Sequence, residues 1–215
     1  YPWLTSGKPI NFELIMPQTV KYLYKQSGQK PNLDLWNKFV PLSGKLNVDE
    51  VDDIEKMWSS TAKKIGYSKD ELKNEIYPIS SLYSIADHSR TLLFALSDGA
   101  LPSNSGGGYN LRSIYRRSMN FVNKYNIKLD YSKLVELHAK EVKPQYPELS
   151  KNIKSVQEIL KSEEQKYNQS KIISKRLISK IIKTTVDENR LLELYDSHGV
   201  TPEELSEASS GKIKV

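Results

Sequence analysis

A glycine-rich segment at residues 106–108 is the first candidate for binding chemistry in this chain. It consists of Gly106, Gly107 and Gly108 and precedes a helical pattern, so its backbone amides and the helix dipole could hold a phosphate. The nucleotide-binding loop that uses such glycines also requires a Gly-Lys-Ser/Thr sequence, which does not follow here. Two interpretations stay open: an anion-binding helix start, or a tight turn between helices in which glycine supplies positive φ angles.

Three arginines follow the glycines on one predicted helix. Arg112, Arg116 and Asn120 are spaced by four residues and therefore share a face, which Arg117 flanks. Guanidinium groups at this spacing suit the phosphates along a nucleic-acid groove, although a solvated face of an amphipathic helix has the same pattern. Residues 109–125 contain no acidic residue, which favours the anion-binding interpretation.

Catalytic and metal-binding arrangements are not predicted. Asp87, His88 and Arg90 lie within a helical pattern, where Asp87 and Arg90 are spaced as a structural ion pair rather than a catalytic dyad. His138 and His198 stand apart from any ligand-like spacing. The chain has no cysteine, so neither a thiolate metal site nor a catalytic thiol is available.

The composition is that of a folded helical protein with an anionic partner. Of the 215 residues, 38% are hydrophobic and 27% charged, and there are only 10 glycines and 10 prolines. Lys and Arg number 32 against 26 Asp and Glu, and the resulting net charge of +6 favours nucleic acid as a partner. The longest apolar run, residues 92–96, is far shorter than the ~20 residues of a membrane span, so no membrane partner is predicted.

Helical patterns dominate the elements that must position these side chains. Capping boxes, in which Ser or Thr and a Glu three residues later satisfy the first amides of a helix, begin at Ser68, Thr185 and Thr201. Apolar residues at helical spacing predict helices at residues 11–26, 47–64, 79–97, 131–142, 150–182 and 187–197, and another from residue 111. Alternating strand patterns are scarce, so the predicted fold class is all-α.

Turn-forming residues divide the chain at 41–44, 98–108 and 143–147. The last break predicts a boundary between two packed helical lobes, at about 1–143 and 144–208, which together form one domain. A polar tail follows at residues 209–215.

The segments around the glycines resemble the signature of the alanyl-tRNA synthetase family. That signature reads ADHxR, DGxxPSN, GYxLR and RR, and the chain has Ala86-Asp87-His88-Ser89-Arg90, Asp98-Gly99, Pro102-Ser103-Asn104, Gly108-Tyr109-Asn110-Leu111-Arg112 and Arg116-Arg117. Leu194-Tyr195-Asp196 with Gly199 and Pro202 is similar to the family's downstream LYDxxG motif. Bacterial members commonly carry Arg where this chain has Gly107, so it is closer to the archaeal branch.

The resemblance implies that residues 1–208 are a helical tRNA-recognition domain of a cytoplasmic enzyme that ligates alanine to its tRNA. It places the catalytic domain, with ATP and Mg, upstream of this chain and a zinc-bearing editing domain downstream. This fragment is therefore expected to hold no cofactor, to catalyse nothing alone and to be monomeric, with tRNA(Ala) and the other domains as its partners.

The resemblance also implies roles for individual residues. Family members identify their tRNA by a G·U wobble pair in the acceptor stem, and the residues carried over are Asn104, from PSN, and Asp196, from LYD. A carboxylate only accepts hydrogen bonds and so suits the exposed guanine amine, whereas an amide can donate to a uracil carbonyl. Arg112, Arg116 and Arg117 would contact backbone phosphates.

A helical protein-interaction module with an incidental basic face is the alternative function. Salt-sensitive tRNA binding would separate the two, because phosphate contacts weaken as salt rises. A nucleotide hydrolase using the glycine-rich segment lacks the lysine and the metal carboxylates it needs.

Overall fold

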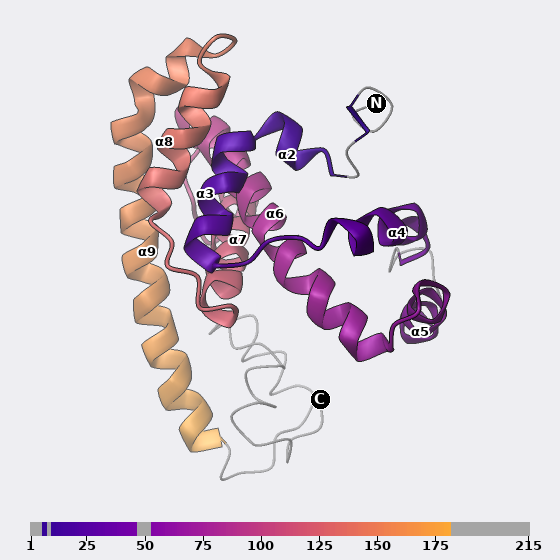
Figure 1. Ribbon diagram of the computed structural model, residues 1–215. Helices are drawn as coiled ribbons and strands as arrows, with labels where there is room; N and C mark the ends of the chain where they lie inside the picture. Colours follow the sequence, from indigo (N-terminus) through magenta and orange to yellow (C-terminus); the bar gives the residue numbers. More distant parts are fainter. Residues whose placement is uncertain (1–5, 8–9, 47–52, 182–215) are drawn as a thin grey trace. The chain divides into compact units, whose positions relative to one another are not determined.

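The computed structural model describes residues 6–7, 10–46 and 53–181, without the side chains of residues 179–181 (Figure 1). The elements in these ranges are α2 (Phe12–Ile15), α3 (Pro17–Ser27), α4 (Leu33–Ser43), a 3-10 turn η1 (Gly44–Leu46), α5 (Ile54–Ile65), α6 (Lys69–Ser97), α7 (Gly106–Lys124), α8 (Tyr131–Val142) and α9 (Pro147–Ile181). This described part of the chain contains no strand, which confirms the predicted all-α class.

Two compact units divide the chain, Tyr1–Ile159 and Leu160–Val215. The division falls inside α9, and the first unit contains α2 to α8 together with the candidate site described below. The predicted lobe boundary near residue 143 stays a prediction. The predicted capping boxes at Thr185 and Thr201, the helix at 187–197 and the tail at 209–215 lie outside the described residues.

The central helix of the first unit is α6, which contacts α3, α5, α7 and α8 (Figure 1). Its buried residues recur along its whole length, from Leu72 to Leu96, and include polar Ser89. A helix that is apolar around most of its circumference belongs in a core. Leu92 and Leu93, both 0% exposed, anchor its last turns. The loop that follows α6 therefore starts from a rigid support.

The capping box at Ser68 is confirmed. The Ser68 hydroxyl accepts from the Glu71 N–H at 3.3 Å, and the Glu71 carboxylate accepts from the Ser68 N–H at 2.9 Å. The helix it begins continues through Pro78 into the segment predicted at 79–97, so the two predicted features are one helix. Burial of the side chains on both sides of Pro78 stabilises the helix by more than the loss of the backbone hydrogen bond that proline cannot make destabilises it.

Two other prolines also shift predicted boundaries. Pro17 splits the helix predicted at 11–26, because the residue before proline disfavours helical geometry and Met16 has φ −139° and ψ 50°. The break predicted at 41–44 contains the end of α4 but begins later than predicted, since Pro41 lies inside this helix, which ends at Ser43. Burial of Trp36 and Phe39 holds this helix against the core.

The helix predicted at 47–64 begins later than its apolar pattern indicates. α5 starts at Ile54 and is capped by Asp53, whose carboxylate accepts from the Lys56 N–H at 2.9 Å. Asp53 has non-helical angles of φ −133° and ψ 88°, so no continuous helix runs through it. The capping preference of aspartate decided this boundary.

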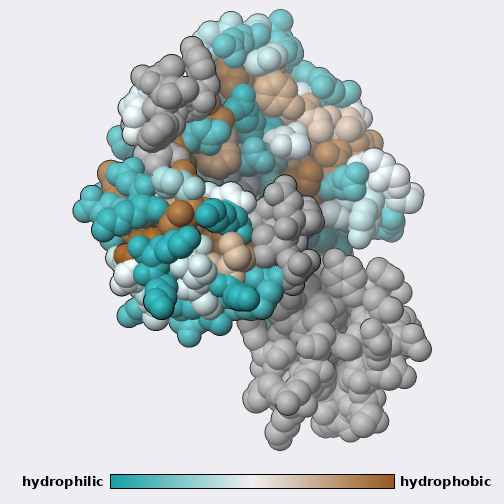
Figure 2. Space-filling view, turned by 90° about the vertical axis from the view of Figure 1, so that its right-hand side faces the viewer, coloured by the Kyte–Doolittle hydropathy of each residue, from teal (hydrophilic) through white to brown (hydrophobic). Residues whose placement is uncertain are grey.

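Hydrophilic side chains cover much of the coloured surface in Figure 2, and apolar side chains are visible in patches between them. Within the part of the chain that the structure describes, no helix combines the length and apolarity needed to cross a membrane.

Candidate nucleic-acid interface

A tight turn begins the loop between α6 and α7, which comprises residues 98–105. The Asp98 N–H donates to the Phe94 carbonyl at 3.0 Å, and the Ala100 N–H donates to the Ala95 carbonyl at 3.0 Å. Between them Gly99 has φ +88°, a left-handed conformation that favours glycine. These bonds fix the direction in which the chain leaves α6.

The middle of this α6–α7 loop lies directly against the first turn of α7. The Ser103 N–H donates to the Gly108 carbonyl at 3.0 Å, and the Ser103 hydroxyl donates to the Ser105 carbonyl at 2.6 Å. A Cβ atom on Gly108 would lie 2.3 Å from the Leu101 carbonyl oxygen and 2.4 Å from the Ser103 hydroxyl oxygen. The loop can approach this closely only because residue 108 has no side chain.

The three predicted turn glycines form the first turn of α7 and differ in what they do. Gly106 begins the helix with φ +61°, where a side chain would be strained. Gly108 permits the close approach of the loop. Gly107 has neither a positive φ nor a close neighbour, since an added Cβ would meet nothing within 4 Å.

Asn104 is exposed in this loop and contacts Arg112 on α7. The Arg112 Nη1 donates to the Asn104 Oδ1. Arg112 lies one helical turn after Gly108, so the attachment of the loop at Gly108 brings Asn104 to its guanidinium group. The structure therefore joins two predicted site residues, one from each side of the glycines.

One face of α7 is buried, and the predicted arginines lie outside it. Its buried residues are Leu111, Tyr115, Ser118 and Val122. The sequence pattern placed Tyr115 close to the basic face of Arg112 and Arg116, yet this side chain is 1% exposed and its ring centroid lies 5.2 Å from that of Tyr131. The helical spacing of Leu111, Tyr115 and Ser118 could have predicted that Tyr115 lies on the buried face. Arg112 and Arg116 are half-buried, and Arg117 is exposed.

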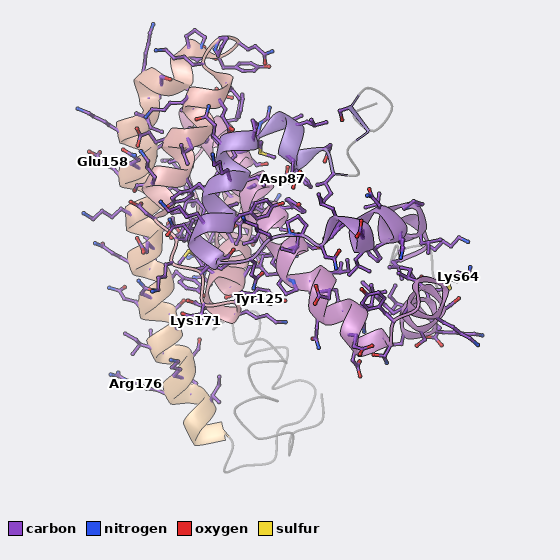
Figure 3. The ribbon with its side chains drawn as sticks, viewed as in Figure 1. Lys64, Asp87, Tyr125, Glu158, Lys171 and Arg176 are labelled. Carbon is purple, nitrogen blue, oxygen red and sulfur yellow. The ribbon has the colours of Figure 1, made fainter. Side chains whose placement is uncertain are left out.

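Positive charge predominates throughout this segment. Residues 99–129 contain no Asp or Glu and five basic residues, namely Arg112, Arg116, Arg117, Lys124 and Lys128. The last turn of α7 carries Lys124 and is followed by Tyr125, which marks the end of the helix in Figure 3. The helix and both of its flanking loops can therefore attract a polyanion.

The Asp-His-Ser-Arg part of the signature lies on α6 and connects surface to core. Asp87, labelled in Figure 3, is exposed, and its carboxylate lies 3.9 Å from the His88 Nδ1. Burial lowers the pKa of His88, the Asp87 carboxylate raises it, and the charge of Arg117 on α7 lowers it. The Arg90 guanidinium lies over the ring of Phe94, at 5.9 Å. Asp87, His88 and Arg90 therefore all interact with neighbouring side chains of the protein.

A buried hydrogen-bonded cluster, which the sequence did not predict, fixes α6 against α8. His138 on α8 is 1% exposed, and its Nε2 lies 2.9 Å from the Ser89 hydroxyl on α6. The Ser89 hydroxyl also donates to the Ala86 carbonyl at 3.0 Å. Burial, and after it the charge of Arg90, lower the pKa of His138 to about 3, so the imidazole is neutral.

Glu141 extends this cluster to the start of α3. Its carboxylate accepts from the backbone N–H groups of Gln18 and Thr19, and from the Thr19 hydroxyl at 2.6 Å. Met16 supplies no side-chain cap and Pro17 has no N–H, so a glutamate distant in sequence caps this helix. We call Thr19, Ser89, His138 and Glu141 the buried polar cluster.

No group of three His, Asp or Glu side chains gathers as metal ligands among the described residues. Asp196 lies outside them, so its predicted partnership with Asn104 stays a prediction. In the second unit Lys171 and Arg176 lie on the C-terminal half of α9 (Figure 3), with the Lys171 amine 5.5 Å from the Tyr167 ring.

Comparison with known protein families agrees with these motifs. Residues 42–213 match the family described as tRNA synthetases class II (A). The matched range includes the α6–α7 loop, α7 and the segment around Asp196. The chain belongs to this family.

Individual relatives bear the name alanine–tRNA ligase. The protein of Methanocella arvoryzae is 36% identical over 210 residues, which are 97% of this chain and 24% of the relative. The protein of Nitrosopumilus maritimus is 36% identical over 213 residues, which are 98% of this chain and 24% of the relative. The predicted family relationship is confirmed, and the chain spans about a quarter of the length of these curated relatives.

Proposed function

We propose that this chain is the tRNA-binding part of an alanine–tRNA ligase and that it binds the acceptor stem of tRNA(Ala), including its G·U wobble pair. The contact between Asn104 and Arg112 carries the proposal, because it holds an exposed amide beside a basic segment with no acidic residue. The relatives named alanine–tRNA ligase support the identity of the RNA.

Base recognition in this proposal belongs to Asn104 and Asp196. The minor groove of A-form RNA is wide and shallow, so short polar side chains can contact base edges there. The Asp196 carboxylate would accept from the guanine amine, and the Asn104 amide would donate to the uracil carbonyl. Arg116 and Arg117 would contact phosphates, which position the stem without specifying its sequence.

The remaining chemistry belongs, in the same proposal, to other parts of a longer cytoplasmic enzyme. Alanine would be ligated in a domain that binds ATP and Mg, and editing would take place in a domain that binds zinc. The described residues present no cluster of three potential metal ligands. In this proposal the chain is a monomer that orients the RNA for the other domains.

Titration of the chain with two tRNA(Ala) transcripts, one with G·U and one with G·C at the wobble position, tests this proposal at two salt concentrations. We expect binding that weakens with salt and a preference for G·U. Asp196→Ala should remove most of that preference, about 1–3 kcal/mol, whereas Arg116→Ala should weaken both complexes alike and flatten the salt dependence. Absent or salt-insensitive binding would favour the protein-interaction module, and equal affinities would exclude recognition of the wobble pair.

A further inference from the structure

We infer that Arg112 is a positioning residue that sets the hydrogen-bonding direction of Asn104, so that Asn104 presents its amide nitrogen to the RNA and selects a base edge carrying an acceptor. This inference rests on the proposed function and deepens it. It assigns Arg112 to the base-recognition apparatus rather than to the phosphates.

The chemistry of the two side chains fixes the orientation of the amide. A guanidinium group has only donors, whereas an asparagine amide has a donor at Nδ2 and an acceptor at Oδ1. The Arg112 Nη1 donates to Oδ1, and a rotated amide would bring two donors together. While Arg112 holds the oxygen, the Nδ2 group lies on the other side of the amide and can only donate.

The backbone fixes the positions from which the two side chains meet. Ser103 is bonded to the Gly108 carbonyl at 3.0 Å, so the residue before Asn104 is attached to α7. Arg112 is half-buried one turn further along the same helix, whereas Asn104 is exposed. The contact therefore orders an exposed side chain that would otherwise rotate in solvent.

A fixed amide distinguishes base edges that a rotating amide would not. Pyrimidine O2 and purine N3 are acceptors in the minor groove, whereas the guanine amine is a donor. A rotating asparagine could bond to either kind, because it could turn Oδ1 or Nδ2 toward the base. With Oδ1 held by Arg112, Asn104 bonds only to acceptors such as the uracil O2, and recognition of the guanine amine is left to Asp196. The cytosine O2 of a G·C pair is also an acceptor, but wobble pairing displaces the uracil O2 from that position, so a donor held at one place can bond to only one of the two.

A double-mutant cycle tests the inference, with preference measured as the ratio of dissociation constants for acceptor-stem hairpins carrying G·C and G·U. Asn104→Ala should reduce the ratio roughly 5- to 150-fold, the range for a lost base-edge contact. Arg112→Ala should cause most of that loss, and the double variant should be no worse than Asn104→Ala alone. Arg112→Lys, which keeps a positively charged group that can only donate hydrogen bonds, should restore part of the ratio.

Arg116→Ala is the matched control, since it removes an arginine from the next turn of α7. We expect it to weaken both hairpins, to keep the ratio and to combine multiplicatively with Asn104→Ala. If Arg112→Ala behaved in this way, or kept the full ratio, Arg112 would be a phosphate contact and the inference would be wrong.

A readout without RNA separates this outcome from failure of the proposed function. If the wild-type chain binds both hairpins equally, the proposed function fails. Side-chain amide order parameters of Asn104 in the free chain then still decide the positioning role. An order parameter of the Asn104 amide that is lower in Arg112→Ala than in the wild type, but unchanged in Arg116→Ala, supports the positioning role. Equal order parameters in the wild type and both variants overturn it. Thermal melting confirms folding, and Arg112→Lys carries the test if Arg112→Ala does not fold.

Discussion

The α6–α7 loop and the buried polar cluster both order polar side chains, but by opposite means. In the buried polar cluster, side chains from α3, α6 and α8 bond to one another out of contact with water, and His138 and Thr19 are 1% and 0% exposed. In the loop, backbone bonds and the absence of a side chain at Gly108 hold an exposed Asn104.

The difference indicates what each region is for. Buried polar groups must find partners inside the protein, since an unsatisfied one destabilises the fold. An exposed amide has water as a partner, so ordering it contributes little to folding. In the proposed function, the cost of holding Asn104 is offset when RNA binds. Changes in the cluster should therefore affect stability, and changes in the loop should affect recognition.

Loss of Glu141 should have the largest effect on stability. Glu141→Ala leaves the N–H groups of Gln18 and Thr19 and the Thr19 hydroxyl without their acceptor, which should lower the free energy of unfolding by about 3 kcal/mol. Urea denaturation measures this loss. Glu136→Ala on the same helix is the control, since its exposed pairs with Lys133 and Lys140 contribute little. Similar losses in both variants would contradict the capping role of Glu141.

Substitution of Gly108 should disturb recognition more than stability. The new Cβ of Gly108→Ala would lie 2.3 Å from the Leu101 carbonyl oxygen, so the loop must move, at about 1–3 kcal/mol. Preference for the G·U hairpin should be lost with it. Gly107→Ala provides a matched control with open space around its Cβ, and it should stabilise the helix by about 0.5–1 kcal/mol while keeping the preference. A preference that survived in Gly108→Ala would show that the loop position does not matter.

Acid should destabilise the buried polar cluster through His138. The folded-state pKa, lowered to about 3, lies below the unfolded value of about 6.5, so the unfolded chain takes up a proton first. This contribution is complete above pH 6.5 and is lost as the pH falls, by about 1 kcal/mol per unit between 6 and 5. Denaturation of the wild type and of His138→Gln across this interval measures it. Equal slopes in the two proteins would exclude His138 as the cause.

The smallest expected effect concerns the electrostatic contact between α6 and α7. Arg117→Ala removes a positive charge that lowers the pKa of His88, so this pKa should rise without a change of fold. An NMR titration of the His88 ring follows it, and Lys128→Ala, which removes an exposed positive charge beyond α7, serves as the control. A pKa that rose as far in Lys128→Ala would mean that Arg117 has no specific proximity to His88.

Local signals in the sequence predicted much of this structure. The capping box at Ser68 and the helical spacing of apolar residues predicted the class of fold, because both act within a few residues. Asn104 was selected from the resemblance and is exposed in the α6–α7 loop, and its role in binding stays a prediction. The break at 41–44 begins later than predicted because α4 continues through Pro41, where burial of Trp36 and Phe39 outweighs the hydrogen bond that proline removes.

The remaining features depend on contacts between distant residues. Glu141 caps a helix 122 residues away at Thr19, and His138 bonds to Ser89 from 49 residues away, so neither has a local pattern. The requirement for glycine at residue 108 comes from the returning loop and not from a positive φ angle. The pairing of Arg112 with Asn104 likewise follows only once the loop is known to fold back on α7.

The most direct test of the central claim is the affinity of the wild-type chain and of Asn104→Ala for acceptor-stem hairpins that differ only in G·U or G·C. We predict that the wild type binds the G·U hairpin more tightly and that Asn104→Ala binds both nearly equally, with its melting temperature unchanged. Equal affinity of the wild type for the two hairpins, or an unchanged preference in Asn104→Ala, would contradict the account.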